Sequence, residues 1–135
     1  METVELLFKS SVNKDKLRIE DDGQVAYAYL LRREKIISFV WLYNRLPPSD
    51  DFEVRLPSRP VLNPLPFLKE GSLVMHPDPS DFSAIWLKRK KEVQAAIYIS
   101  GKLHAILSDD SSPGWSVLVQ LDGPVARVLE VSRTK

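Results

Sequence analysis

The chain has 135 residues, of which 44% are hydrophobic and 27% are charged, a composition typical of a soluble globular domain. Nineteen basic and eighteen acidic residues give a formal net charge of +1, which argues against a duplex nucleic-acid binder, because such proteins usually carry a clear basic excess. The sequence contains no cysteine, which excludes a disulfide framework, thiol catalysis and a cysteine-ligated metal site.

A first β meander is predicted for residues 1–46. Its strands are expected at Val4–Ser10, Leu17–Glu20, Val25–Arg33 and Ile36–Asn44. The last two are rich in β-branched and aromatic residues and apolar on both faces, which is typical of strands that are covered on both sides. Regular alternation along the fourth strand would place Ile37, Phe39, Trp41 and Tyr43 on one face.

Residues 47–79 contain eight of the ten prolines. Proline donates no backbone hydrogen bond and biases its predecessor away from the helical region, so this tract excludes a long helix or a central strand. Phe52, Leu62 and Phe67 are among its many apolar residues, too many to leave in water. We therefore expect an ordered crossover of extended pieces that packs onto the sheet.

A second meander is predicted for residues 80–110. Its three strands are expected at Phe82–Lys88, Val93–Ser100 and Leu103–Ser108. Regular alternation in the last hairpin predicts that Leu103, Ala105 and Leu107 face the core and that His104 faces solvent.

Residues 111–135 are predicted to form short helical turns and a tail. The spacing of Trp115, Leu118 and Val119 fits a short helix as well as a strand, and Pro124 suits the first position of a second helix. The whole chain is thus expected to be one α+β domain, rich in β structure. It would hold an antiparallel sheet of about seven strands in two meanders, a proline-rich crossover and short C-terminal helices.

The search for chemistry gives no catalytic, metal or cofactor site. The two histidines, His76 and His104, lie on different predicted elements, and each is best explained as a solvated or hydrogen-bonded side chain. Paired aspartates at 21–22, 50–51 and 109–110 lie beside turn residues, where Asp caps local backbone groups. The basic run 88–91 fits a solvated hairpin tip, which also protects a strand edge, better than a phosphate site.

Aromatic residues offer the best candidates for binding. Trp41, Tyr43, Asn44 and Arg45 run from a strand directly into the proline tract, and Trp115 is a further candidate. Such residues first serve the core, but Trp, Tyr and Arg also concentrate binding energy at protein interfaces. We predict a recognition surface at these five residues.

Several segments are similar to a group of small uncharacterised bacterial proteins. They are Val40-Trp41-Leu42-Tyr43-Asn44-Arg45 with Pro47-Pro48, Pro113-Gly114-Trp115-Ser116, Gly123-Pro124-Val125-Ala126 and Leu129-Glu130. Some members of the group look like immunity proteins of contact-dependent or polymorphic toxin systems. The resemblance implies a single-domain cytoplasmic protein that binds and blocks a cognate toxin, and it carries over no site residues.

The sequence therefore predicts a non-enzymatic protein-binding module, an immunity-type inhibitor with a protein partner and no cofactor. A small-ligand-binding or enzymatic β-barrel is the alternative, with Tyr27, Tyr29, Phe39 and Trp41 lining a cavity. A cytoplasmic location is expected, because the N-terminus carries acid where a signal peptide carries base, and no apolar run approaches the roughly 20 residues of a membrane helix. The oligomeric state stays open.

Overall fold

The computed structural model describes residues 4–23, 25–44, 54–56, 59–62, 77–118 and 126–129, and these are mostly β-strands. A four-stranded antiparallel sheet, in the order β1-β2-β3-β4, consists of β1 (Val4–Lys9), β2 (Lys16–Asp21), β3 (Val25–Arg32) and β4 (Lys35–Asn44). This sheet confirms the first predicted meander.

A second sheet has five strands in the order β11-β10-β9-β8-β7. They are β7 (Phe82–Arg89), β8 (Glu92–Ile99), β9 (Lys102–Ser108), β10 (Ser111–Ser116) and β11 (Arg127–Val128). Its pairings are antiparallel except for that of β10 with β11, which is parallel. The strands β7, β8 and β9 confirm the second predicted meander.

Tight two-residue turns join the long hairpins of both sheets. Arg33 and Glu34 between β3 and β4 have φ angles of 54° and 64°, and Ser100 and Gly101 between β8 and β9 have 53° and 80°. Positive φ at both central residues matches the right-handed twist of the flanking strands, so these turns close hairpins without splaying them.

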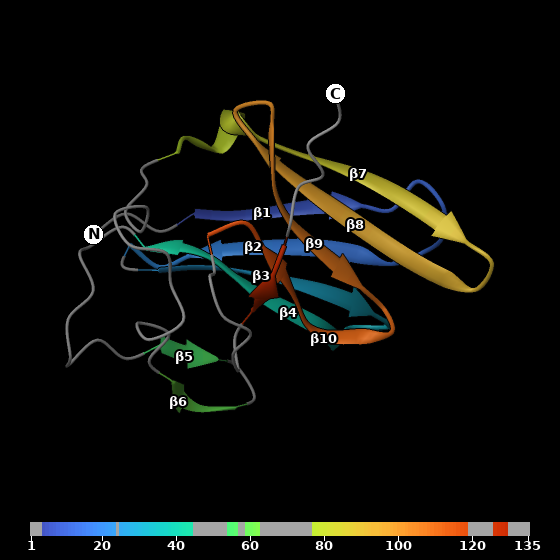
Figure 1. The fold of residues 1–135 in the computed structure, drawn as a ribbon, viewed down its shortest axis with the longest axis horizontal. Coiled ribbons are helices and arrows are strands. Elements are labelled where there is room, and N and C mark those ends of the chain that lie inside the picture. The colour runs from blue at the N-terminus through green and yellow to red at the C-terminus, as the bar shows by residue number, and fades with distance from the viewer. Residues whose placement is uncertain are drawn as a thin grey trace.

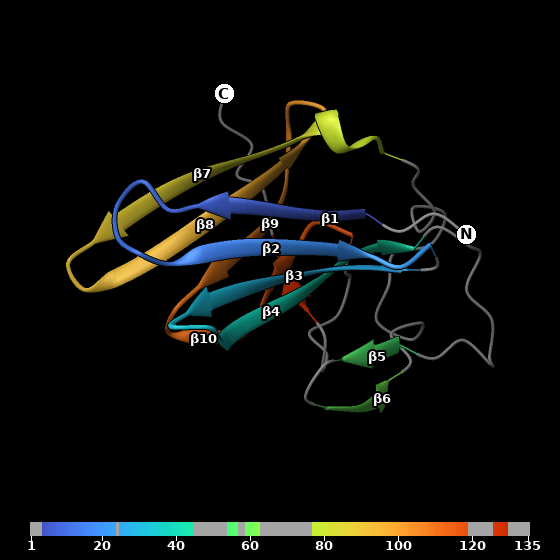
Figure 2. The same ribbon diagram turned by 180° about the vertical axis from the view of Figure 1, so that it is seen from behind.

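The two sheets form two layers that face each other. Figure 1 shows the five-stranded sheet in front, Figure 2 shows the four-stranded sheet in front, and the strands of the two layers cross at an angle. One cluster of buried apolar side chains includes members from both sheets, such as Leu17, Leu30, Ile97 and Leu107, all 0% exposed. The inward faces of the two sheets therefore share a core.

Of the proline-rich tract, only residues 54–56, 59–62 and 77–79 belong to the described part. A short hairpin, β5 (Val54–Leu56) with β6 (Arg59–Leu62), forms a separate two-stranded sheet, and a 3₁₀ turn spans Pro79–Asp81. Pro60 lies in β6, in keeping with the confinement of proline to edge strands. The expectation that the tract packs onto the first sheet falls mostly outside the described residues.

The predicted C-terminal helices are wrong. Residues 111–116 form strand β10 and residues 127–128 form β11, and the 3₁₀ turn is the one helical element in the described residues. Trp115 pairs with Ile106 of β9, because docking beside a strand satisfies backbone groups that a short helix would leave unpaired. The fold class is thus β-rich, with two main sheets of four and five strands besides the two-stranded one. This corrects the prediction of a single sheet of about seven strands with short C-terminal helices.

The prediction that Trp41 and Tyr43 lie on one face of their strand is wrong, because β4 contains a bulge. Tyr27 pairs with Trp41 and Ala26 with Tyr43, so β4 carries one extra residue, Leu42, between these pairs. Because opposite residues share a face and successive residues do not, Trp41 and Tyr43 point to opposite sides of the sheet.

The prediction that His104 faces solvent is also wrong, because β9 contains a second bulge. Ile97 pairs with Ala105 and Tyr98 with Leu103, so His104 is the extra residue on β9. The histidine turns inward and is 5% exposed, whereas Leu103, predicted to face the core, is only half-buried.

Among the described residues, no helix is long and apolar enough to cross a membrane.

Candidate functional site

Three of the five predicted binding residues lie in the interior. Trp41, Tyr43 and Asn44 are each 0% exposed. The indole Nε1 of Trp41 donates a hydrogen bond to Asn44 Oδ1 at 3.1 Å, while Asn44 Nδ2 is buried and has no hydrogen-bond partner among the described residues. Side chains buried to this degree pack the fold, so a partner would have to bind elsewhere on this conformation. Arg45 lies outside the described residues.

Tyr43 joins a buried polar network between the sheets. Its hydroxyl donates to Asp21 Oδ2 at 2.7 Å, and the Gly23 amide donates to Asp21 Oδ1 at 2.9 Å. The ring of Tyr43 meets His104 edge-on at 6.4 Å. His104 Nε2 lies 2.6 Å from the Leu42 carbonyl oxygen, which can only accept, so this nitrogen carries the proton. Burial lowers the pKa of His104, and the hydrogen bond to Leu42 opposes that effect.

Two of the four aromatic residues of the alternative hypothesis, Tyr27 and Tyr29, line a small hollow in the described part of the chain. Tyr27, Tyr29, Phe39 and Trp41 are all buried. The hollow lined by Tyr27 and Tyr29 has a volume of about 50 Å³, whereas ligand pockets usually measure about 300–1,000 Å³. Burial raises the pKa of both tyrosines, so their hydroxyls stay protonated and supply no base.

An ionic cluster links the two sheets. It consists of Arg32 at the end of β3, Asp15 just before β2 and Asp109 just after β9. Arg32 donates from Nε to Asp15 Oδ1 at 2.9 Å and from Nη2 to Asp15 Oδ2 at 2.7 Å and Asp109 Oδ2 at 2.9 Å. Asp109 Oδ1 also accepts from the Val93 amide at 3.1 Å. The bond to Arg32 holds the pKa of Asp15 below its usual value, although burial opposes this. Every group here has a partner, which indicates a structural clamp.

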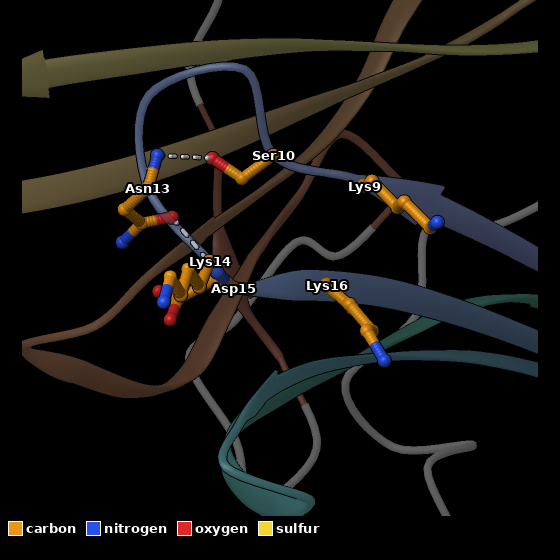
Figure 3. A pocket seen from close by; sticks show the side chains of 6 residues that line it. All are labelled: Lys9, Ser10, Asn13, Lys14, Asp15 and Lys16. Carbon is orange, nitrogen blue, oxygen red and sulfur yellow. Dashed lines mark hydrogen bonds between the residues drawn. The ribbon is translucent and has the colours of Figure 1, made fainter.

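A hollow of about 270 Å³ lies at the loop between β1 and β2, and three lysines are among its lining residues. The loop holds itself through bonds from the Asn13 amide to Ser10 Oγ and from the Asp15 amide to Asn13 Oδ1. Figure 3 shows Lys9 and Lys16 extending away from Lys14 rather than toward a common point. Because the ammonium groups do not converge, the hollow is not built to hold an anion.

The outward face of the five-stranded sheet carries an unexpected row of apolar side chains. Ile85 of β7 pairs with Ala96 of β8, Ala96 with Ile106 of β9, and Ile106 with Trp115 of β10. Directly opposite residues share a face, so these four side chains form one row across four strands. We call it the apolar row.

The apolar row faces away from the core. Ile85 is 50% exposed and its neighbour two residues on, Leu87, is 49% exposed. Ile106 and Trp115 are half-buried, and neither belongs to the core cluster. The outward side of a two-layer antiparallel sheet is normally polar, so this run of apolar residues departs from the usual pattern.

Positive charge stands at both margins of this face. Arg127 of β11 pairs with Trp115, and its guanidinium carbon lies 5.9 Å from the centre of the indole ring. Arg89 at the end of β7 is exposed on the same face as Ile85 and Leu87. Of the predicted binding residues, Trp115 alone is placed by the described structure on a partly exposed surface.

Ile85, Ile106 and Leu87 were missed as binding candidates from the sequence. The alternation Ser83, Ile85, Leu87, Arg89 is visible in the chain, but it fits an inward face as well as an outward one. The signal that could have found them is the pair of bulky residues Phe82 and Trp86 on the opposite face, both buried here.

In the described ranges, no group of three or more His, Asp or Glu side chains is arranged to hold a metal ion. No protein-family model, no curated protein and no solved structure matches the chain.

Proposed function

We propose that this protein is a non-enzymatic protein-binding module and that its partner docks on the outward face of the five-stranded sheet. The apolar row carries the proposal, since Ile85, Ile106 and Trp115 are exposed in part on the side opposite the core. Trp and Arg are among the residues that most often dominate binding energy, and Trp115 with Arg127 supplies both.

The charges at the margins indicate the chemistry of the partner. Arg89 and Arg127 stand at opposite sides of the face and both are exposed. A partner surface with apolar residues at its centre and carboxylates at its rim would complement them, and charge complementarity at a rim speeds and selects association. In line with the resemblance found in the sequence, we propose that the partner is a bacterial toxin that this protein binds and blocks.

Co-expression tests the proposal directly. The tagged chain is expressed with the products of adjacent genes, and a stoichiometric complex together with protection from toxicity is the expected result. Ile106→Lys places a charge at the centre of the apolar row and is expected to weaken the complex roughly 100-fold, as at a binding hot spot.

Leu7→Lys is the matched control. Leu7 of β1 is 52% exposed, but it lies on the outward face of the other sheet. This variant should bind as the unchanged protein does, and circular dichroism should show both variants folded. Unchanged binding by folded Ile106→Lys, or the absence of any complex and any protection, would count against the proposal.

A further inference from the structure

The outer edge of β7 is open in the described part of the chain, where β7 pairs with β8 alone. Proteins usually protect such an edge with charges or proline, because its free backbone groups can pair with another strand. In β7 the exposed charges, Lys88 and Arg89, stand only at the end of the strand. The middle of β7 instead carries Ile85 and Leu87, each about half exposed. This edge therefore has the properties of a strand that accepts a partner strand.

The charges around β7 are self-complementary. Asp78 is exposed and Asp81 partly exposed just before the strand, while Lys88 and Arg89 at its end and Lys91 in the following turn are all exposed. When two copies of such a strand pair antiparallel, the acidic end of each meets the basic end of the other. We propose that a second copy of this chain pairs antiparallel with β7 about a two-fold axis.

One register fits both the charges and the apolar residues. With Trp86 on the two-fold axis, Ile85 of each copy stands opposite Leu87 of the second copy, and Asp81 stands opposite Lys91. Opposite residues share a face, so Ile85 and Leu87 of both copies form one outward cluster. The outward faces of the two copies then join across a sheet of ten strands.

The edge of β1 is the rival site for a second copy, since Leu7 is also exposed there. Leu7, however, stands opposite Arg18 of β2. Arg18 already forms two ion pairs, from Nε to Glu5 Oε2 at 3.7 Å and from Nη1 to Glu20 Oε2 at 3.6 Å. A lone apolar residue opposite a charge makes a poor contact, whereas Ile85 stands opposite Ala96. The edge of β7 is therefore a better site than the edge of β1 for pairing with a second copy.

Pairing through β7 goes beyond the proposed function, because it uses the strand edge and leaves Ile106 and Trp115 accessible to another protein. Analytical ultracentrifugation of the intact chain is the first test. The unchanged protein should sediment as a dimer that dissociates on dilution, and Ile85→Lys should weaken the dimer roughly 100-fold or more, since the substitution counts twice in a symmetric interface.

Two controls make this measurement specific. Leu7→Lys, with the same change at an exposed residue of the edge strand β1, should leave the dimer intact. Lys91→Glu, which would face Asp81, should weaken it, while Lys35→Glu at an exposed position on β4 should not. A monomeric unchanged protein overturns the inference, and so does a dimer that Leu7→Lys disrupts and folded Ile85→Lys does not.

The register is tested with engineered cysteines, because the chain has none of its own. Equal amounts of Ile85→Cys and Leu87→Cys chains are mixed and oxidised gently. The disulfide between the two different chains should clearly exceed the sum of the two symmetric disulfides, because the β-carbons of Ile85 and Leu87 stand opposite each other in this register. Random pairing of equal amounts would make it equal to that sum, so a mixed disulfide that does not exceed the sum overturns this register. Loss of toxin binding in Ile106→Lys with the dimer intact would separate this inference from the proposed function.

Discussion

On the outward face of β1 and β2 most cross-strand neighbours are charged, whereas the outward face of β7 to β10 carries one row of cross-strand neighbours that are all apolar. Glu5 stands opposite Glu20 and Lys9 opposite Lys16, with Arg18 near both glutamates. In the other sheet the corresponding positions form the apolar row. Both faces belong to antiparallel sheets that share one core, so the packing of the core does not account for the difference.

The contrast shows that two sheets of one fold can differ in the polarity of their outward faces. Charges on the face that includes β1 protect an edge strand from pairing, because another strand would have to desolvate them. Apolar residues on the opposite sheet lose little when covered and gain by leaving water, at about 25 cal/mol for each Å² buried. The two faces should therefore respond differently to substitution.

Gly114→Ala should have the largest effect, because it breaks the apolar side of the comparison. A β-carbon at Gly114 would overlap the Ile106 carbonyl oxygen and approach Leu107 Cδ2 to 2.9 Å. Strand β10 would have to move from β9, which separates Trp115 from the rest of the row and costs about 3 kcal/mol of unfolding free energy. Chemical denaturation measures the loss.

Gly101→Ala is the matched control for this glycine. Its φ is +80°, but nothing lies within 4 Å of an added β-carbon, so strain in the turn alone should cost about 1 kcal/mol. Equal losses at the two glycines would contradict the close approach of β10 to β9.

An intermediate effect is expected from acidification, through the bulge that turns His104 inward and Leu103 outward. Burial lowers the pKa of His104, so the unfolded chain takes up this proton at higher pH than the folded chain does. Its contribution to stability is complete above the ordinary histidine pKa, near 6.5, and is lost as the pH falls through the lowered folded value. The melting temperature should therefore fall with pH in this window.

His104→Gln identifies the source of that fall. The glutamine amide can still donate to the Leu42 carbonyl, but it does not titrate. The melting temperature of this variant should depend less on pH between about 7 and 5 than that of the unchanged protein. Parallel pH profiles of the two proteins would show that His104 is not the group responsible.

Arg18→Ala should have the smallest effect, on the charged side of the comparison. Arg18 is about one-third exposed and its ion pairs with Glu5 and Glu20 are long, so solvent screening limits their worth to about 0.5 kcal/mol. Denaturation at low and at high salt should show the difference shrinking as salt is added. A loss above about 1 kcal/mol that salt does not change would mean that Arg18 acts through packing.

Much of the strand arrangement could be predicted from local patterns. The turn Asp21-Asp22-Gly23 follows from residues that cap their own backbone, and the Asp21 and Asp22 carboxylates do accept from the Gly23 and Val25 amides. The candidate site was harder to predict, because aromatic residues such as Trp41 and Tyr43, which first serve the core, also occur at binding surfaces. Their burial depends on neighbours that sequence proximity does not reveal.

The sequence by itself determined where the strands and hairpins of the two meanders form, because alternation and turn residues act over a few neighbours. Tertiary structure decided which side of each strand faces the core. A single extra residue in a bulge reverses the alternation beyond it, as at Leu42 and His104, and a bulge depends on the partner strand. It also made residues 111–116 a strand, since β9 offers backbone groups that no local helix could provide.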